Sequence, residues 1–229
     1  MAHNSTANRG VLFDVDGTLV DSNYLHAVAW WQAFRRMDLD VPMSAVHRAI
    51  GMGGDKLVEH LLGEDRDKDQ DEKLDETHGA IFSTWWPSLR SFDGAKELLL
   101  ACAGKELTVV LASSASEPEL KVLRTVIDAD AAIAAATSSS DAEESKPSPD
   151  ILQAALDSSA LTAEDTIFVG DSVWDVKAAA ELKIPTIGLL CGGTSEAELR
   201  DAGASEIWEN PRELLENLDS SLLGKLAAR

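Results

Sequence analysis

From residue 105 onward, short apolar runs alternate with stretches that have helical periodicity. Apolar and β-branched runs bounded by turn residues predict buried strands, and apolar positions repeated every three or four residues predict helices. The predicted strands cover residues 107–112, 131–137, 166–169, 185–190 and 207–208; the predicted helices cover residues 117–127, 149–156 (with Ser148 as its cap), 173–182, 196–202 and 211–223. Strands alternating with helices are typical of a parallel sheet that helices cover on both faces.

The first half of the chain follows a different pattern. Val11, Leu12 and Phe13 predict one more buried strand, but residues from about 22 to 88 have helical periodicity and no convincing strand. We therefore expect an α/β fold with three layers and a helical cap inserted after the first strand. The expected core domain comprises residues 1–21 and 89–229, and the expected cap domain comprises residues 22–88.

Composition narrows the class of protein. The chain has 229 residues, of which 45% are hydrophobic and 26% charged, as in ordinary globular proteins. Twenty basic residues stand against 40 acidic ones, which gives a formal net charge of −20. So acidic a surface argues against nucleic acids and acidic membranes as partners. An anionic substrate would need local positive charge in its site.

The compartment is predicted from what the sequence lacks. The first ten residues, MAHNSTANRG, contain no apolar core, so we expect no secretory signal. No apolar run approaches the roughly 18 residues of a membrane span. Cys102 and Cys191 show no metal-ligand spacing and are expected to be buried free thiols. These features together predict a cytoplasmic protein.

Asp14 and Asp16 come directly after the first predicted strand, in the string FDVDGTLV. Side chains alternate along a strand, so both carboxylates are predicted to share one face where the strand gives way to a loop. Two carboxylates at so short a distance repel one another unless a proton or a hard cation lies between them. A lone pair of aspartates can serve as turn or helix caps, but the apolar strand before this pair favours a functional site.

Three further sites carry chemistry-bearing side chains near the ends of predicted strands. Ser113 and Ser114 follow one strand, Lys146 lies in the string KPSPD, and Asp171 and Asp175 fall four residues apart at the start of a helix. Taken one at a time, Ser113 could be a turn residue, Lys146 a surface lysine and Asp171 a helix cap. Ligands of open α/β sheets bind at the carboxyl ends of the strands, so their shared placement predicts one common site.

In this order, the motifs DVDGT, Ser113, Lys146 and GDSVWD resemble those of the haloacid dehalogenase superfamily of aspartate-nucleophile hydrolases. The resemblance runs from about Gly10 to the last helix. It implies a Rossmann-like core and the smaller helical cap of the phosphoglycolate phosphatase and β-phosphoglucomutase relatives. These motifs are highly specific for the superfamily and weakly specific for the substrate.

The resemblance also implies a mechanism. Asp14 would attack phosphorus and form an aspartyl-phosphate, while Asp16 would protonate the leaving alcohol and then activate water. Mg²⁺ would be held by the carboxylates of Asp14 and Asp171 and by the backbone carbonyl of Asp16. Asp175 would reach the metal through water or orient Lys146.

Phosphate binding and the type of reaction follow from the same resemblance. Ser113, Ser114 and Lys146 would bind phosphoryl oxygens, and with Mg²⁺ they would supply the positive potential that the chain lacks elsewhere. Dehalogenases of this fold lack the second aspartate. The presence of Asp16 therefore favours hydrolysis of a phosphate ester or phosphoryl transfer.

The cap is expected to select the substrate, and His26, Gly51 and Lys56 are its candidate residues. His26 would either orient Asp16 when the cap closes or simply pack as a histidine on a helix face. Gly51 lies in a glycine-rich loop, at a place where β-phosphoglucomutases have a Lys-Gly pair and this chain has Ile50-Gly51. This departure disfavours a mutase. Lys56 is either a substrate contact or a surface residue.

The predicted activity is that of a Mg²⁺-dependent phosphatase, a phosphoric monoester hydrolase acting on a small metabolite of the sugar phosphate or phosphoglycolate type. One alternative is a sugar-phosphate mutase resembling β-phosphoglucomutase. The other is a catalytically silent protein of the same fold that serves as a binding module. The expected partner is a small-molecule phosphate ester, without nucleic acid or membrane, and the chain is expected to be a monomer or a weak homodimer.

Overall fold

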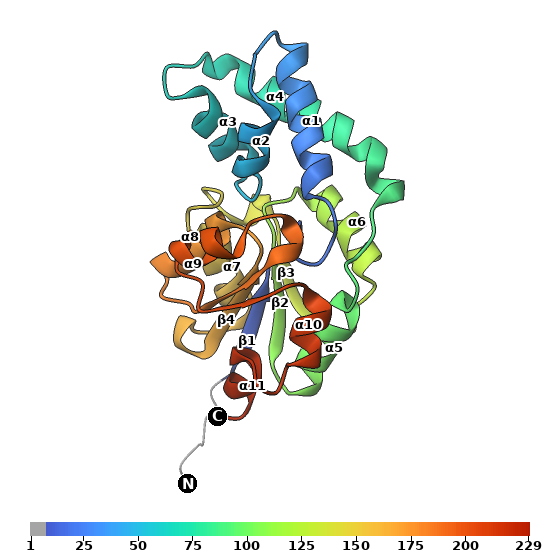
Figure 1. Cartoon of the computed structure of the whole chain (residues 1–229), viewed down its shortest axis with the longest axis vertical. Coiled ribbons are helices and arrows are strands. Elements are labelled where there is room, and N and C mark those ends of the chain that lie inside the picture. Colours follow the sequence, from blue (N-terminus) through green and yellow to red (C-terminus); the bar gives the residue numbers. More distant parts are fainter. Residues whose placement is uncertain (1–7) are drawn as a thin grey trace.

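Figure 1 shows the computed structural model, which describes residues 8–229 and has a parallel sheet at its centre. Its strands are β1 (Gly10–Phe13), β2 (Thr108–Ala112), β3 (Ile133–Thr137), β4 (Thr166–Gly170), β5 (Thr186–Leu189) and β6 (Glu206–Trp208). The six strands lie in the order β3-β2-β1-β4-β5-β6, and every neighbouring pair is parallel. The predicted α/β fold with a parallel sheet is confirmed.

Helices cover both faces of this sheet, so the strands β1, β4 and β5 are buried on both sides. On β1, Val11 and Phe13 belong to one apolar cluster and Leu12 to another, as strand alternation requires. The first cluster includes residues of α5 (Ala95–Gly104), α6 (Glu117–Ile127), α10 (Pro211–Glu216) and α11 (Leu222–Ala227); the second includes residues of α7 (Asp150–Ser159) and α8 (Val173–Glu181). Helix α9 (Glu196–Ala202) packs beside α8.

Residues 22–88, called the helical insert below, fold between β1 and α5. The insert contains α1 (Asn23–Arg36), α2 (Met43–Ala49), α3 (Gly54–Leu62) and α4 (Asp71–Phe82), and it lies beyond the carboxyl ends of the strands (Figure 1). The four helices pack around an apolar cluster of their own, which includes Trp30, Phe34, Leu57 and Leu74. The division of the chain into a core and a cap domain stays a prediction.

Short 3₁₀ helices occur in several of the connections between helices and strands. They cover Lys68–Gln70, Ser83–Ser88, Ser139–Asp141, Ala163–Asp165 and Leu190–Gly192. The two connections between the insert and the sheet run side by side, because Val20 and Ser91 form an antiparallel bridge. The Asp21 N–H donates to the Arg90 carbonyl at 3.0 Å, so the chain leaves the core and returns to it at one place.

The predicted helix over residues 211–223 is wrong in one respect: the chain folds there as two helices, α10 and α11, with a break between them. Ser221 causes the new start, because its hydroxyl accepts a hydrogen bond from the Gly224 N–H and donates one to the Leu218 carbonyl. A β-carbon at position 224 would lie 2.3 Å from the Leu218 carbonyl oxygen, so this close approach requires glycine.

A second difference concerns the start of α7. The helix begins at Asp150, and Pro149 occupies its N-cap position. Ser148 is therefore not the cap; its hydroxyl donates instead to the Asp150 carboxylate at 2.9 Å. Proline is well suited to a helix start because it has no N–H to leave unpaired.

Residues 1–7 lie outside the described part of the chain, and so does most of the segment from which the absence of a secretory signal is predicted. Within residues 8–229, no helix is both long and apolar enough to cross a bilayer. Both cysteines are free thiols; Cys102 is buried and Cys191 is partly buried.

The centre of the sheet should dominate stability. Leu12 is fully buried on β1, between two flanking strands, whereas Leu100 on α5 is 42% exposed. We expect Leu12→Ala to lower the free energy of unfolding by about 2–5 kcal/mol because it removes buried methyl groups and leaves a cavity. The same substitution at Leu100 should change it by less than about 0.5 kcal/mol. Urea denaturation of both variants tests this, and equal losses would contradict it.

Candidate active site

The motif residues gather at the carboxyl ends of the strands. Asp14 follows β1, and its N–H donates to the Val169 carbonyl at 2.9 Å. Ser113 follows β2 and Asp171 follows β4, while Lys146 reaches the same place from the loop between β3 and α7. The sheet therefore brings together side chains that lie far apart in the sequence, as the sequence analysis expects.

Lys146 lies buried among carboxylates. Its Nζ atom is 2.5 Å from Oδ1 of Asp14 and 2.9 Å from Oδ1 of Asp175, and only 1% of the residue is exposed. The other Asp175 oxygen accepts hydrogen bonds from the Ser172 N–H and hydroxyl, at 3.0 and 2.7 Å, in the capping box of α8. Asp175 is thereby fixed by the helix start and holds Lys146 against Asp14.

Two residues that the sequence analysis did not assign to the site fix Asp171. The Thr18 hydroxyl lies 2.9 Å from Asp171 Oδ1 and 3.0 Å from Asp14 Oδ2, so it links the two aspartates. The Asn23 amide nitrogen donates to Asp171 Oδ2 at 2.8 Å and to the Gly192 carbonyl at 3.0 Å. Thr18 was within the DVDGT motif, but nothing in the sequence pattern singles out Asn23.

This cluster holds more negative than positive charge. Carboxylate oxygens of Asp14, Asp171 and Asp175 all lie within 4.8 Å of one another, and all three residues are buried. Burial raises the pKa of Asp14 to about 7 even though Lys146 opposes the shift. Burial and the neighbouring Asp175 also raise the pKa of Asp171 well above its ordinary value. When all three carboxylates are ionised, the single ammonium leaves two negative charges, which a divalent cation would balance.

Asp16 faces a different group of side chains. Its Oδ1 accepts a hydrogen bond from the Ser22 hydroxyl at 2.6 Å and lies 3.2 Å from Nε2 of His26. The same His26 nitrogen is 3.4 Å from Oε1 of Glu119, and its other nitrogen is 3.1 Å from Nε2 of His78. His26 therefore contacts Asp16 and also packs on the helix face. Glu119 and His78 were missed because neither lies in a motif.

Asp16 and His26 shift each other's pKa values in opposite directions. Burial alone would raise the pKa of Asp16, but hydrogen bonds from His26 and Ser22 lower it below its usual value. Burial likewise opposes protonation of His26, yet Asp16 and Glu119 raise the pKa of this histidine. Burial raises the pKa of Glu119 to about 7. Asp16 and His26 thus form a pair in which the carboxylate of Asp16 and the imidazolium of His26 each favour the charged form of the other.

A cavity of about 550 Å³ opens onto both aspartates from beneath the insert. Asp14, Asp16, Ser114 and Gly51 are among its lining residues, and Ser113 and Lys146 are not. The Ser114 hydroxyl is buried without a hydrogen-bond partner among the described residues. Gly51 has a φ of +101°, and a β-carbon there would lie 2.4 Å from the Ser172 hydroxyl oxygen, so glycine permits this close contact.

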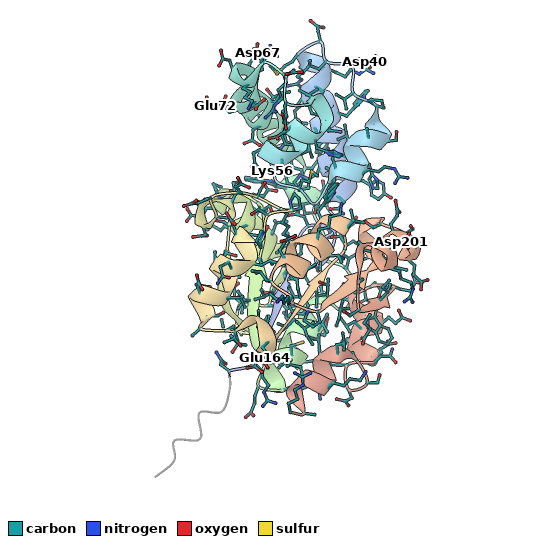
Figure 2. The ribbon with its side chains drawn as sticks, turned by 90° about the vertical axis from the view of Figure 1, so that its left-hand side faces the viewer. Asp40, Lys56, Asp67, Glu72, Glu164 and Asp201 are labelled. Atoms are coloured by element: carbon teal, nitrogen blue, oxygen red, sulfur yellow. The ribbon has the colours of Figure 1, made fainter. Side chains whose placement is uncertain are left out.

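Lys56 is directed elsewhere. Figure 2 shows it at the end of the insert nearest the core, whereas Asp40 and Asp67 lie toward the far end. Its Nζ atom pairs with Glu144 at 3.1 Å, and Lys56 is not among the lining residues of the cavity. The geometry therefore gives Lys56 a contact between the insert and the core instead of a contact with the cavity.

Further contacts hold the insert on the core. Arg48 pairs with Glu198 at 2.6 Å, and its carbonyl accepts a hydrogen bond from the Trp174 indole at 3.0 Å. The Ser145 hydroxyl donates to the Asp55 carboxylate. These polar contacts join the insert to the core beside the cavity.

Comparisons with known proteins agree with this arrangement. A family model described as haloacid dehalogenase-like hydrolase matches residues 11–189, from β1 to the end of β5. A crystal structure of a hydrolase from Pseudomonas syringae has a TM-score of 0.88 at 31% identity, covering 93% of this chain and 98% of that one.

Two curated relatives extend the comparison. The phosphoglycolate phosphatase of Yersinia pestis is 31% identical over 191 residues, which are 81% of this chain and 82% of that protein. The chloroplastic protein SUPPRESSOR OF QUENCHING 1 of Arabidopsis thaliana is 30% identical over 207 residues. That match covers 86% of this chain but 19% of the Arabidopsis protein.

Proposed function

The chain belongs to the haloacid dehalogenase-like hydrolases, and from this premise we propose that it is a Mg²⁺-dependent phosphatase of a small metabolite that works through an aspartyl-phosphate. Its enzyme class is that of a phosphoric monoester hydrolase. One observation carries the proposal: a buried group with Asp14 and Lys146 and a second group with Asp16 and His26 meet at one cavity. A nucleophile and a proton donor are thereby held in separate surroundings.

Asp14 is the proposed nucleophile. A carboxylate oxygen attacks the phosphorus of the bound ester, a bond forms between them, and the bond from phosphorus to the alcohol oxygen breaks. Lys146 and the Thr18 hydroxyl contact the Asp14 carboxylate and fix its orientation before the attack. The buried surroundings also keep bulk water from solvating this carboxylate, which maintains its reactivity.

Asp16 is the proposed acid and base. It delivers a proton to the departing alcohol oxygen, and in the second step it takes a proton from the water that attacks the aspartyl-phosphate. That attack releases inorganic phosphate and restores Asp14. Because His26 lowers the pKa of Asp16, we place the resting proton on the Asp16–His26 pair and not on Asp16 alone.

Mg²⁺ fits the first group because three buried carboxylates face one ammonium there, and carboxylate oxygens are the ligands that this ion prefers. Asp14 and Asp171 would hold the ion together with the backbone carbonyl of Asp16. When bound, Mg²⁺ would neutralise negative charge on the phosphoryl group. Asp175 would serve mainly to orient Lys146, to which it is paired at 2.9 Å.

The proposed phosphoryl contacts are Ser113, Ser114 and Lys146. The unpartnered hydroxyl of Ser114 lines the cavity and is available to donate to a phosphoryl oxygen. The Ser113 hydroxyl accepts a hydrogen bond from the Ala115 N–H at 3.0 Å, which fixes the loop after β2. Its own proton stays available for the substrate.

Metal removal tests the proposal. We expect the purified protein to release p-nitrophenol and phosphate from p-nitrophenyl phosphate in the presence of Mg²⁺. Excess EDTA should reduce the rate by about 10³-fold or more, because no metal ion then neutralises the negative charge of the phosphoryl group. Restoring Mg²⁺ should restore the rate. Full activity in EDTA would contradict metal dependence.

The cavity argues against a mutase. A sugar-phosphate mutase must bind a second phosphate, which calls for a basic side chain remote from the nucleophile. No lysine or arginine is among the described residues that line the cavity. A phosphatase, which needs one phosphate site, is the better fit.

A further inference from the structure

Most of the charged residues that line the 550 Å³ cavity are acidic. In addition to Asp14 and Asp16, six carboxylate residues line it: Asp55, Asp71, Glu72, Asp75, Glu119 and Glu143. Among the described lining residues there is no lysine or arginine. The part of the cavity that would receive the alcohol of a substrate therefore differs in charge from a site for an anion.

Some of these carboxylates have partners in the protein. Asp71 accepts hydrogen bonds from Arg66 at 2.8 to 3.1 Å, and Asp55 accepts one from Ser145. Within residues 8–229, Asp75 has no ion-pair or hydrogen-bond partner. It lies at the wall beside Gly54, where a β-carbon would come within 2.5 Å of its Oδ1 atom. Its charge is thus free to act on a bound molecule.

Glu119 is an independent sign that a positive group belongs here. It is 9% exposed, and its Oε1 atom has no hydrogen-bond partner among the described residues. Its nearest cationic group is His26, at 3.4 Å, which is also shared with Asp16. As an anion, a buried carboxylate that is only partly balanced costs free energy, and a cationic ligand would offset this cost.

The cavity wall also has an aromatic part. Trp30 lines the cavity, and its ring stacks on His78 with the centroids 4.2 Å apart. Burial and the neighbouring His26 hold the pKa of His78 well below its usual range, so His78 adds no positive charge. Trp30 is only 3% exposed, so this aromatic part of the wall adds neither positive charge nor an open ring face, and the carboxylates determine the charge of the cavity.

We propose that the substrate is the phosphate monoester of an amino alcohol or amino sugar, whose ammonium group is held by the acidic wall of the cavity. This narrows the proposed phosphatase function and rests on it. Carboxylates at the wall repel an alcohol that carries its own carboxylate or a second phosphate, and they attract a cation. Phosphoglycolate, the substrate named for the Yersinia relative, should therefore be poor here.

Two size-matched series test the charge of the alcohol at low salt. One contains glucosamine 6-phosphate, glucose 6-phosphate and 6-phosphogluconate, and the other contains phosphoethanolamine, glycerol 3-phosphate and phosphoglycolate. In at least one series kcat/KM should be highest for the cationic ester and about tenfold or more lower for the anionic one. The preference should shrink as salt is added. A neutral or anionic ester preferred in both series would overturn the proposal.

The variant Asp75→Asn tests whether the acidic wall causes the preference for cationic esters, and Glu76→Gln is its matched control. Glu76 is the next residue of α4, exposed, and absent from the lining of the cavity. We expect Asp75→Asn to reduce the ratio of cationic to anionic kcat/KM by about threefold to tenfold and Glu76→Gln to leave it unchanged. Equal ratios in both variants would overturn the role of the wall.

Hydrolysis of p-nitrophenyl phosphate tests the phosphatase activity independently of the preference for cationic esters. A protein that fails to hydrolyse this ester with Mg²⁺ present would refute the phosphatase itself. A protein that hydrolyses it but shows no preference for cationic esters would refute only the substrate class. A circular dichroism spectrum and a urea unfolding curve like those of the unsubstituted protein show that Asp75→Asn is folded.

Discussion

Asp14→Asn is expected to lower kcat for p-nitrophenyl phosphate by about 10⁴-fold or more. An amide oxygen is a far weaker nucleophile than a carboxylate, and the substitution changes no volume in the site. Lys146 keeps its second partner, Asp175, at 2.9 Å, so the surrounding cluster should persist. The measurement is phosphate release with saturating Mg²⁺, at substrate concentrations above and below KM.

Asp201→Asn is the matched control for this experiment. Asp201 is exposed on α9 at the side of the core (Figure 2) and does not line the cavity, so the same chemical change there should leave the rate unaltered. A circular dichroism spectrum like that of the unsubstituted protein shows that Asp14→Asn is folded. A folded Asp14→Asn protein with undiminished activity would exclude Asp14 as the nucleophile.

The sequence predicts the catalytic edge of the sheet well because simple rules govern it. Asp14, Ser113 and Asp171 each follow a short apolar strand, and parallel strands place such residues at one edge. The expectation that Asp14 and Asp16 share one face is less accurate. Strand β1 ends at Phe13, and in the turn beyond it the two carboxylates face different groups, Lys146 and His26.

The contacts that helices of the insert and of the core make around the site could not be predicted from the sequence. Asn23, His78 and Glu119 reach the site because α1, α4 and α6 approach one another in three dimensions, and no local spacing encodes that approach. The position of Lys56 could not be predicted either: its positive charge suits a contact with a phosphorylated substrate, but it pairs with Glu144. The acidic wall of the cavity combines residues from four separated segments of the chain, so it too is a property of the packing.

Asp16→Asn should divide the reaction into its two steps. p-Nitrophenolate leaves without being protonated, so Asp14 can still be phosphorylated when the acid is missing. Hydrolysis of the aspartyl-phosphate needs a base for water, and it should slow by about 10²–10⁴-fold. We therefore expect a burst of one p-nitrophenol per active site, followed by slow turnover, in a stopped-flow absorbance trace.

An alkyl ester gives the decisive contrast. Its alkoxide leaves poorly without a proton, so Asp16→Asn should show no burst with glycerol 3-phosphate, while intact-protein mass spectrometry should detect one added phosphoryl group only after mixing with the aryl ester. Asp14→Asn should show neither a burst nor an added group with either ester. Equal bursts from both esters would mean that another residue, such as His26 at 3.2 Å from Asp16, supplies the proton directly. The acid would then be the histidine, and Asp16 would position it and act as the base for water.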